Sequence, residues 1–184
     1  MPSSKGSFFV AMKQFVLERF GAEHWARVME TLPEEERAQI EAATSISWVD
    51  VEVRVHALHA LQNVLNSRDP NLLTNMGRFE AEKDLSTTQR LFLRLANPGY
   101  AMQKAGQYWR RFHDWGGLEV ERLSRQEARA SVVDSVVADK LWCIQFQAYM
   151  GRVFELVGAR EVRMEHVKCR ARGDDRCVFE GSWK

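Results

Sequence analysis

Three cysteines and a histidine near the C-terminus constrain the fold more than any other feature of this chain. Cys143, Cys169 and Cys177 are its only cysteines, all lie in its last quarter, and His166 stands three residues before Cys169. Three thiols and an imidazole form a complete tetrahedral ligand set for zinc, of the closed kind that leaves no position for a substrate. The pattern predicts a structural zinc site, which the fold of this chain must assemble.

The local patterns show how these four ligands can meet. Cys143 lies on a helix predicted from about Ala138 to Val157, on an apolar stripe that faces the core. A hairpin turning near Gly173 would bring Cys169 and Cys177 opposite each other. A regular strand would point His166 and Cys169 to opposite faces, so a shared metal requires a bulge or a strand end between them.

Two other interpretations of the cysteines remain open. Free cysteine is among the most buried residue types, so each thiol can serve as a small core residue. A disulfide between Cys169 and Cys177 is the other alternative. The N-terminal apolar run at 8–12 is too short for an export signal, and the number of cysteines is odd. We therefore expect a reducing compartment, the cytoplasm, and we favour zinc because all four groups converge on one corner.

Composition sets the outer limits. The 184 residues, 45 % of them hydrophobic, suffice for one domain with a full core, and we expect the range 1–184 to form a single domain. The formal net charge of +1 gives no reason to expect a nucleic-acid partner. No stretch approaches the roughly 20 apolar residues that cross a bilayer, so we expect no membrane span.

The range 1–113 reads as mainly helical. Apolar residues recur at helical spacing over 8–20 and 25–32, and Pro33 followed by three glutamates is typical of a helix start. Further helix starts are predicted at Ser47–Asp50, Asp69–Pro70, Ser86–Gln89 and Asn97–Pro98, and the last of these helices should end near His113.

The range 114–184 follows a different pattern. Residues 118–123 and 128–132 suit two strands, the long helix follows, and two more strands surround Gly173. The predicted fold class is α+β, with a helical N-terminal half packed on a roughly four-stranded antiparallel sheet and one long helix between the strand pairs.

From about Pro98 to Trp183 the chain resembles a 4-vinyl-reductase domain, the small-molecule-binding module of some transcription activators. The resemblance rests on the segment from Glu165 through His166, Cys169 and the Gly173-Asp174 turn to Phe179, preceded by Cys143. In that family an acid stands three residues before the first cysteine of the turn, where this chain has His166. The resemblance implies a sensory role and the same metal ligand set.

The N-terminal segment, from Lys5-Gly6 to Trp25, is similar to the opening of haem nitric-oxide-binding domains, which share a broad fold group with 4-vinyl-reductase domains and TRAPP-type subunits. The Tyr-x-Ser-x-Arg motif that holds haem propionates in that family is absent, because none of Tyr100, Tyr108 and Tyr149 is followed by the required pair. On this ground we expect no haem. The cofactor that we expect is zinc, because of the three cysteines and His166.

An aromatic cluster precedes the predicted sheet. Ligand pockets are mainly apolar with a few placed polar groups, and by resemblance to the sensor domains we expect a pocket lined by Trp109, His113, Trp115, Phe146 and Tyr149. The sequence has no Gly-rich phosphate loop, no Gly-x-Ser-x-Gly and no His-Glu-x-x-His, so we predict no catalytic residues.

These observations predict a non-catalytic, zinc-stabilised domain that binds a small apolar or aromatic molecule and signals through a protein partner, as a homodimer. The alternative is a TRAPP-like dimeric scaffold with no soluble ligand. The two differ in one feature: a sensor needs an internal cavity with polar anchors, whereas side chains can fill a scaffold.

Overall fold

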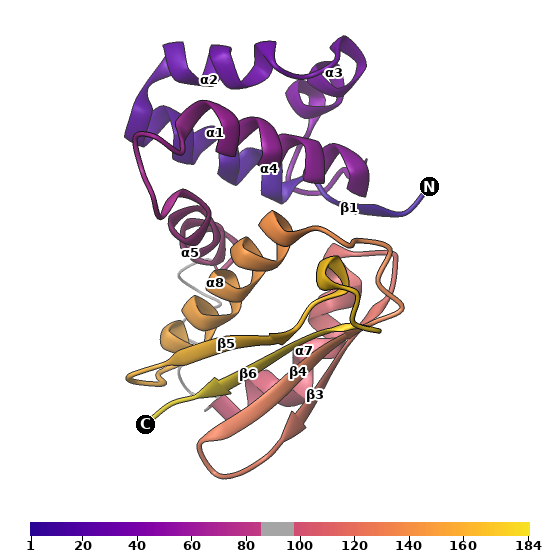
Figure 1. Ribbon diagram of the computed structural model, residues 1–184, viewed down its shortest axis with the longest axis vertical. Coiled ribbons are helices and arrows are strands. Elements are labelled where there is room, and N and C mark those ends of the chain that lie inside the picture. Colours follow the sequence, from indigo (N-terminus) through magenta and orange to yellow (C-terminus); the bar gives the residue numbers. More distant parts are fainter. Residues whose placement is uncertain (86–97) are drawn as a thin grey trace.

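The computed structural model describes residues 1–85 and 98–184 as a helical N-terminal half set against an antiparallel sheet and its helices (Figure 1). This is the predicted α+β class. The predicted helix start at Ser86–Gln89 lies outside the described residues. Within them, no helix combines the length and the apolar character needed to cross a membrane.

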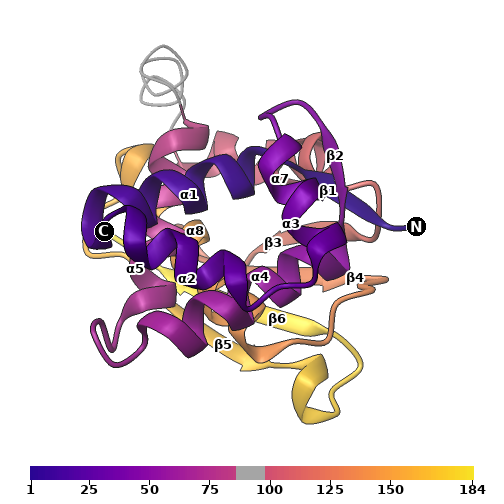
Figure 2. The same ribbon diagram turned by 90° about the horizontal axis from the view of Figure 1, so that it is seen from above.

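The N-terminal half consists of α1 (Ser7–Phe20), α2 (Ala22–Glu30), α3 (Glu34–Ala42), α4 (Val51–Leu65) and α5 (Leu72–Asp84). In Figure 2, which is seen from above, α1, α2 and α4 lie in front of α8 and the sheet. The apolar stripe of α1 supplies fully buried residues, among them Phe8, Met12 and Phe15. Burying such side chains stabilises the half by roughly 1.5–3 kcal/mol for each.

Two short strands in this half were not predicted. β1 (Ser3–Lys5) pairs antiparallel with β2 (Trp48–Asp50), and Ser4 also forms a bridge with His113. Three residues are too few to show the alternation that marks a strand in sequence. The cap of α4 also differs from the prediction, because Asp50, and not Ser47, accepts a hydrogen bond from the backbone N–H of Glu52 at 3.0 Å.

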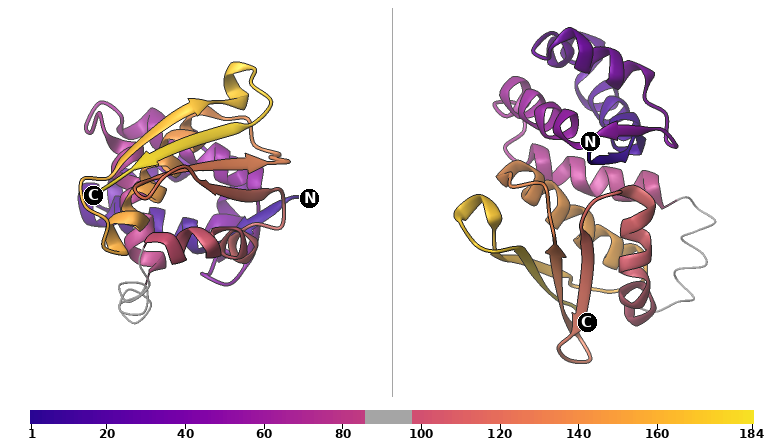
Figure 3. Two further views of the ribbon diagram at one scale, coloured as in Figure 1. Left: turned by 90° about the horizontal axis from the view of Figure 1, so that it is seen from below. Right: turned by 90° about the vertical axis from the view of Figure 1, so that its right-hand side faces the viewer.

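The C-terminal half has the predicted order of strand, strand, helix, strand, strand. After α7 (Pro98–Phe112) come β3 (Gly117–Arg122), β4 (Glu127–Val133), α8 (Lys140–Leu156), β5 (Arg163–Lys168), a 3-10 turn (Arg170–Arg172) and β6 (Cys177–Ser182). The sheet order is β3-β4-β6-β5, with antiparallel neighbours throughout. Helices α7 and α8 pack on one face of this sheet (Figure 3).

Helix α5 packs along α8 and joins the two halves. The close approach depends on Gly77, because a Cβ built there would overlap the carbonyl oxygen of Gln145. The same crossing buries a polar cluster, in which Arg54 of α4 meets Glu80 of α5 and Gln145 of α8. The two halves are therefore held in register by both shape and charge.

Candidate functional site

The four predicted metal ligands come together at one corner of the sheet. Cys143 comes from α8, His166 from β5, Cys169 from the turn after β5, and Cys177 from the start of β6. Their ligand atoms all lie within 4.8 Å of one another, and each cysteine is only 1 % exposed. The fold therefore brings these four side chains together at one buried corner.

A bulge solves the spacing problem between His166 and Cys169. The pairing of β5 with β6 is regular up to His166 opposite Phe179 and then shifts by one residue, so that Lys168 pairs with Val178. The shift turns the chain so that both ligand side chains face the same corner, as the sequence required. The ring of His166 stacks on Phe179 with centroids 4.4 Å apart, which fixes its orientation.

The geometry of the cluster fits a tetrahedral metal. The Sγ atom of Cys143 lies 3.5 Å from that of Cys177 and 4.0 Å from that of Cys169. Zinc–thiolate bonds of about 2.3 Å correspond to sulfur–sulfur edges of roughly 3.8 Å in a tetrahedron, between these two values. The buried Nε2 of His166 has no hydrogen-bond partner among the described residues, as expected of a ligand atom.

Hydrogen bonds to the backbone also hold this corner of the sheet. The N–H of Arg170 donates to the Sγ of Cys177 at 3.4 Å, and the carboxylate of Asp174 accepts from the N–H of Cys169 at 2.6 Å. Hydrogen bonding from Cys143 lowers the pKa of Cys177 to about 5, while the same contact raises the pKa of Cys143. The corner thus favours one sulfur anion even before a cation is considered.

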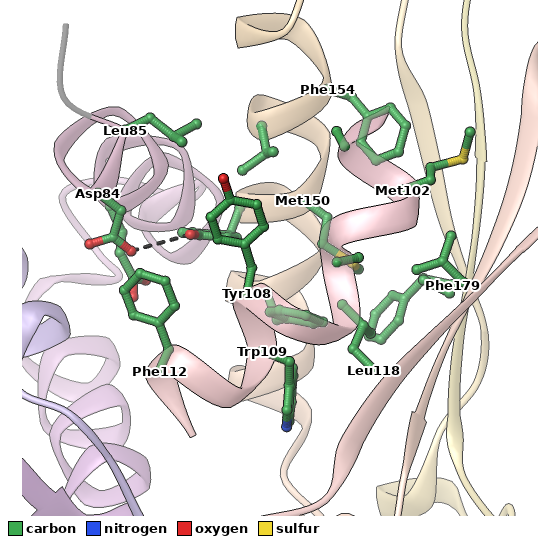
Figure 4. Close-up of a pocket in the computed structure, with 18 of the residues that line it drawn as sticks. Asp84, Leu85, Met102, Tyr108, Trp109, Phe112, Leu118, Met150, Phe154 and Phe179 are labelled. Carbon is green, nitrogen blue, oxygen red and sulfur yellow. Dashed lines mark hydrogen bonds between the residues drawn. The ribbon is translucent and has the colours of Figure 1, made fainter. Parts of the chain in front are cut away.

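A cavity of about 190 Å³ lies between α7, α8 and the inner face of the sheet. Figure 4 shows Asp84 and Leu85 at one end, Met102, Phe154 and Phe179 at the other, and Tyr108 and Trp109 between them. Most of its lining is apolar, and small residues such as Ala105 of α7 and Gly181 of β6 leave the space open. It is separate from the cysteine corner, since no cysteine lines it.

Polar side chains close the end of the cavity that faces the helical half. The guanidinium of Arg54 donates to Glu80 at 3.2 Å and to Gln145 at 3.1 Å, and Gln145 donates to Glu80 in turn. Tyr149 donates to Asp84 at 3.2 Å. Burial raises the pKa of Glu80 to about 7, even though Arg54 lowers it, and burial raises the pKa of Asp84 to about 6.

Most of the predicted pocket residues line this cavity: Trp109, His113, Phe146 and Tyr149. Trp115 does not line it; it is buried with its ring 5.0 Å from that of Trp109, and its carbonyl accepts from the Trp109 indole. His113 is held by Ser4 at 2.8 Å between Nδ1 and Oγ, and burial lowers its pKa well below the usual value, so the ring is neutral.

Sequence reasoning predicted Tyr149 as a pocket residue but missed the charged residues at the polar end. Its charged members are far in sequence from their partners: Arg54 is 26 positions from Glu80, and Asp84 is 65 positions from Tyr149. One signal was present: Glu80 follows Met76 and Gly77 at helical spacing on the apolar stripe of α5, where a charge is out of place.

Comparison with known proteins identifies the fold. No protein-family model and no curated protein matches the sequence. Among solved structures, an H-NOX protein from S. oneidensis in the Fe(II)NO ligation state matches with a TM-score of 0.73 at 12 % identity, covering 98 % of this chain and 99 % of that one. The unliganded Fe(II) H-NOX protein from K. algicida matches with a TM-score of 0.72 at 14 % identity, covering 98 % and 96 %. The predicted fold group is confirmed in its H-NOX part, while the 4-vinyl-reductase label finds no support among these matches.

The expectation that haem plays no part is contradicted by this likeness. The chain has the fold of H-NOX, the haem nitric-oxide-binding domains, and the matched structures are of Fe(II) proteins and their NO and CO complexes. The missing Tyr-x-Ser-x-Arg motif was a poor guide because at 12–14 % identity a fold can be kept while its motifs change.

Groups suited to a haem are present in the cavity. His113 offers an imidazole whose Nδ1 is already oriented by Ser4, as ligating histidines are by their second nitrogen's partner. Lys5 and Arg111 at the lining are cations of the kind that bind carboxylates. These residue types suit a haem, but the cavity of about 190 Å³ is smaller than the roughly 300–1,000 Å³ of pockets for drug-sized ligands.

Proposed function

We propose that this protein is a sensory domain that binds a small molecule in the cavity between α7, α8 and the sheet, and passes its state to a protein partner. The observation that carries the proposal is an apolar cavity with buried polar anchors at one end. A scaffold has no need of such a space, since interiors are otherwise packed to crystal density. The cavity favours the sensor over the TRAPP-like alternative.

The position of the anchors suggests how occupancy is transmitted. Two of them, Arg54 and Glu80, line the cavity, and Gln145 lies next to it. The hydrogen bonds among these three residues also hold the helical half to α8. A ligand that changes the hydrogen bonding or charge at this end therefore acts on the contact between the two halves. Such a ligand shifts the balance between two arrangements only by its difference in affinity for them.

A cavity-filling pair of variants tests ligand binding. Ala105 lines the cavity on α7, whereas Gln107 is exposed on the same helix. Apolar and aromatic ligands in excess should raise the melting temperature of the wild type by linkage, and Gln107→Phe should behave like it. Ala105→Phe should abolish the ligand-induced shift. Equal shifts in both variants would place binding outside the cavity, and no shift with any ligand would favour the scaffold.

We further propose that Cys143, His166, Cys169 and Cys177 bind one structural zinc ion. The metal would tie α8 to β5 and β6, and its binding free energy would become part of the stability of the fold. A four-ligand site leaves no open position, so it has no catalytic role. The proposal rests on the donor set, the spacing of the sulfurs and the unpartnered nitrogen of His166.

Metal analysis tests the zinc proposal. The purified, untagged protein should hold close to one equivalent of zinc, and Cys169→Ser should lose it and lower the melting temperature strongly. His166→Glu should be milder, because a carboxylate is also a zinc ligand. A metal-free wild type that is fully folded would refute the zinc site, and equal losses in the two variants would remove His166 from the ligand set.

A haem in the same cavity is the second candidate, favoured by the H-NOX fold and by the imidazole of His113. Bound there, haem would supply an iron centre for a small gas. Titration with hemin should then give a Soret band that saturates at one equivalent. Ala105→Phe should prevent this binding, and His113→Ala should shift the wavelength of the Soret maximum. A titration with no stoichiometric end point would exclude this candidate and leave the organic ligand.

A further inference from the structure

The cavity is lined by two carboxyl groups, those of Glu80 and Asp84, and by three cations, those of Lys5, Arg54 and Arg111. Glu80, Asp84 and Arg54 form its polar end. Arg54 is committed to Glu80 and Gln145, and its guanidinium also lies over the ring of Phe8 at 4.2 Å. Arg54 therefore forms its direct ion pair with Glu80, and its charge acts on Asp84 only from a distance, lowering the pKa that partial burial raises.

The hydrogen-bond donors that the described part of the chain offers to Asp84 are neutral. Tyr149 donates to it at 3.2 Å, and Ser7 also bonds to it. Among residues 1–85 and 98–184, no Lys, Arg or His nitrogen forms an ion pair with this carboxyl within 4.0 Å. A buried carboxylate without a cation is costly, and burial accordingly favours its protonated form.

The other cations of the lining are engaged elsewhere. Lys5 donates to the carbonyl of Ile46 at 2.7 Å and lies over the ring of Trp48 at 4.0 Å. Arg111 lies over the ring of Tyr108 at 5.2 Å. His113 is neutral because burial lowers its pKa. Among the described residues, none of these cations bonds to Asp84, so an anionic ligand placed there would face a like charge.

Aromatic rings surround the approach to Asp84. Tyr108 and Phe112 of α7 stand beside Asp84 (Figure 4). Phe146 and Tyr149 of α8 also line the cavity, and their rings stack with centroids 6.3 Å apart. Ring faces attract cations, and more strongly where water is excluded. The apolar remainder of the cavity, toward Met102 and Phe154, accepts a hydrocarbon group.

We infer that the cavity takes a protonated primary amine carried on an aromatic or apolar group, with the ammonium on Asp84 and the hydrocarbon directed toward Met102 and Phe154. This inference rests on the proposed function and names its ligand class. A charge-assisted hydrogen bond to a buried carboxylate is about twice as strong as a neutral one, so charge should decide among ligands of one shape.

Three probes of matched size test the inference: 2-phenylethylamine, 2-phenylethanol and phenylacetate. Titration calorimetry at pH 7.5 should show the amine binding about tenfold more tightly than the alcohol, with the phenylacetate weakest. Asp84→Asn keeps the shape but removes the charge, and it should bring the amine to the level of the alcohol. Glu82→Gln, on the same helix outside the cavity lining, should keep the preference of the wild type.

The outcomes separate the two proposals. Equal binding of amine and alcohol, tighter binding of phenylacetate, or an amine preference that survives Asp84→Asn would overturn the amine inference and leave the sensor in place. Binding of none of the probes would count against both. Thermal unfolding of each variant shows that it is folded, and Asp84→Ser, which also removes the charge, takes the place of Asp84→Asn if that variant does not fold.

Discussion

Asp84 is the residue at which the electrostatics of the cavity can be measured without any ligand. Its carboxyl is partly buried and accepts a hydrogen bond from Tyr149, and desolvation raises its pKa from 3.8 to about 6. A raised pKa means that the folded state binds the proton more tightly than the unfolded state does. The resulting stability is present below about pH 4 and is lost as the pH rises through 6.

The first prediction at this scale follows from that sign. Asp84→Asn should raise the melting temperature at pH 7.5 by roughly 2–4 °C, equivalent to about 1 kcal/mol in a chain of this length, and change it little at pH 4.5. Comparing variant with wild type at each pH cancels the titration of all other groups. A variant less stable than the wild type at pH 7.5 would show that Asp84 is paired as a charge in the folded protein.

The convergence of the three cysteines and His166 was predictable at the residue scale, and the charged group at the polar end was not. Cysteine is rare in this chain, so three thiols and a neighbouring histidine stood out, and the required bulge between His166 and Lys168 is present. Charged residues are common on helices, and nothing local marks Arg54 as the partner of Glu80, 26 positions away. Such pairs emerge only when α4, α5 and α8 are brought together.

Among the elements, the crossing of α5 and α8 decides how the two halves are joined. It passes closest at Gly77, where an added Cβ would overlap the backbone oxygen of Gln145. Backbone cannot move aside as a flexible side chain can. Gly151 on α8 differs, because its nearest neighbour is the Cγ of Met164 at 3.3 Å.

These two glycines give a matched pair of substitutions. Gly77→Ala should destabilise the protein by roughly 2–3 kcal/mol, because the helices must separate, although alanine is the better helix former. Gly151→Ala should stay within about 1 kcal/mol of the wild type, because Met164 can adjust while the helix gains propensity. Chemical denaturation measures both. Equal effects would mean that the crossing is looser than the structure has it.

Periodicity predicted most elements because most are long enough to show it. Helices α1, α4, α7 and α8 each span 14 residues or more, and the alternation in β4 matches its buried and half-buried pattern. The three-residue strands β1 and β2 carry no such signal. They form where the segments that precede α1 and α4 lie side by side, and only the tertiary fold brings these two segments together.

On the scale of the whole molecule, the two candidate sites lie in different surroundings. The cysteine corner binds strands to the start of α8, and the cavity lies between α7, α8 and the sheet with its polar end against the helical half. With the proposed zinc bound, the first site would stabilise the sheet, while a ligand in the second would lie where it can alter the contact between the halves. The likeness to H-NOX structures extends over 98 % of the chain, so both halves belong to this arrangement.

A crystal structure of the purified, untagged protein, grown with 2-phenylethylamine, tests the central claim most directly. The account predicts density for the amine between α7, α8 and the sheet, with its nitrogen within hydrogen-bond distance of Asp84, and one zinc ion bonded to the three cysteines and His166. A cavity closed by the side chains of Trp109, Phe146 and Met150, with no density other than protein inside it, would contradict the account.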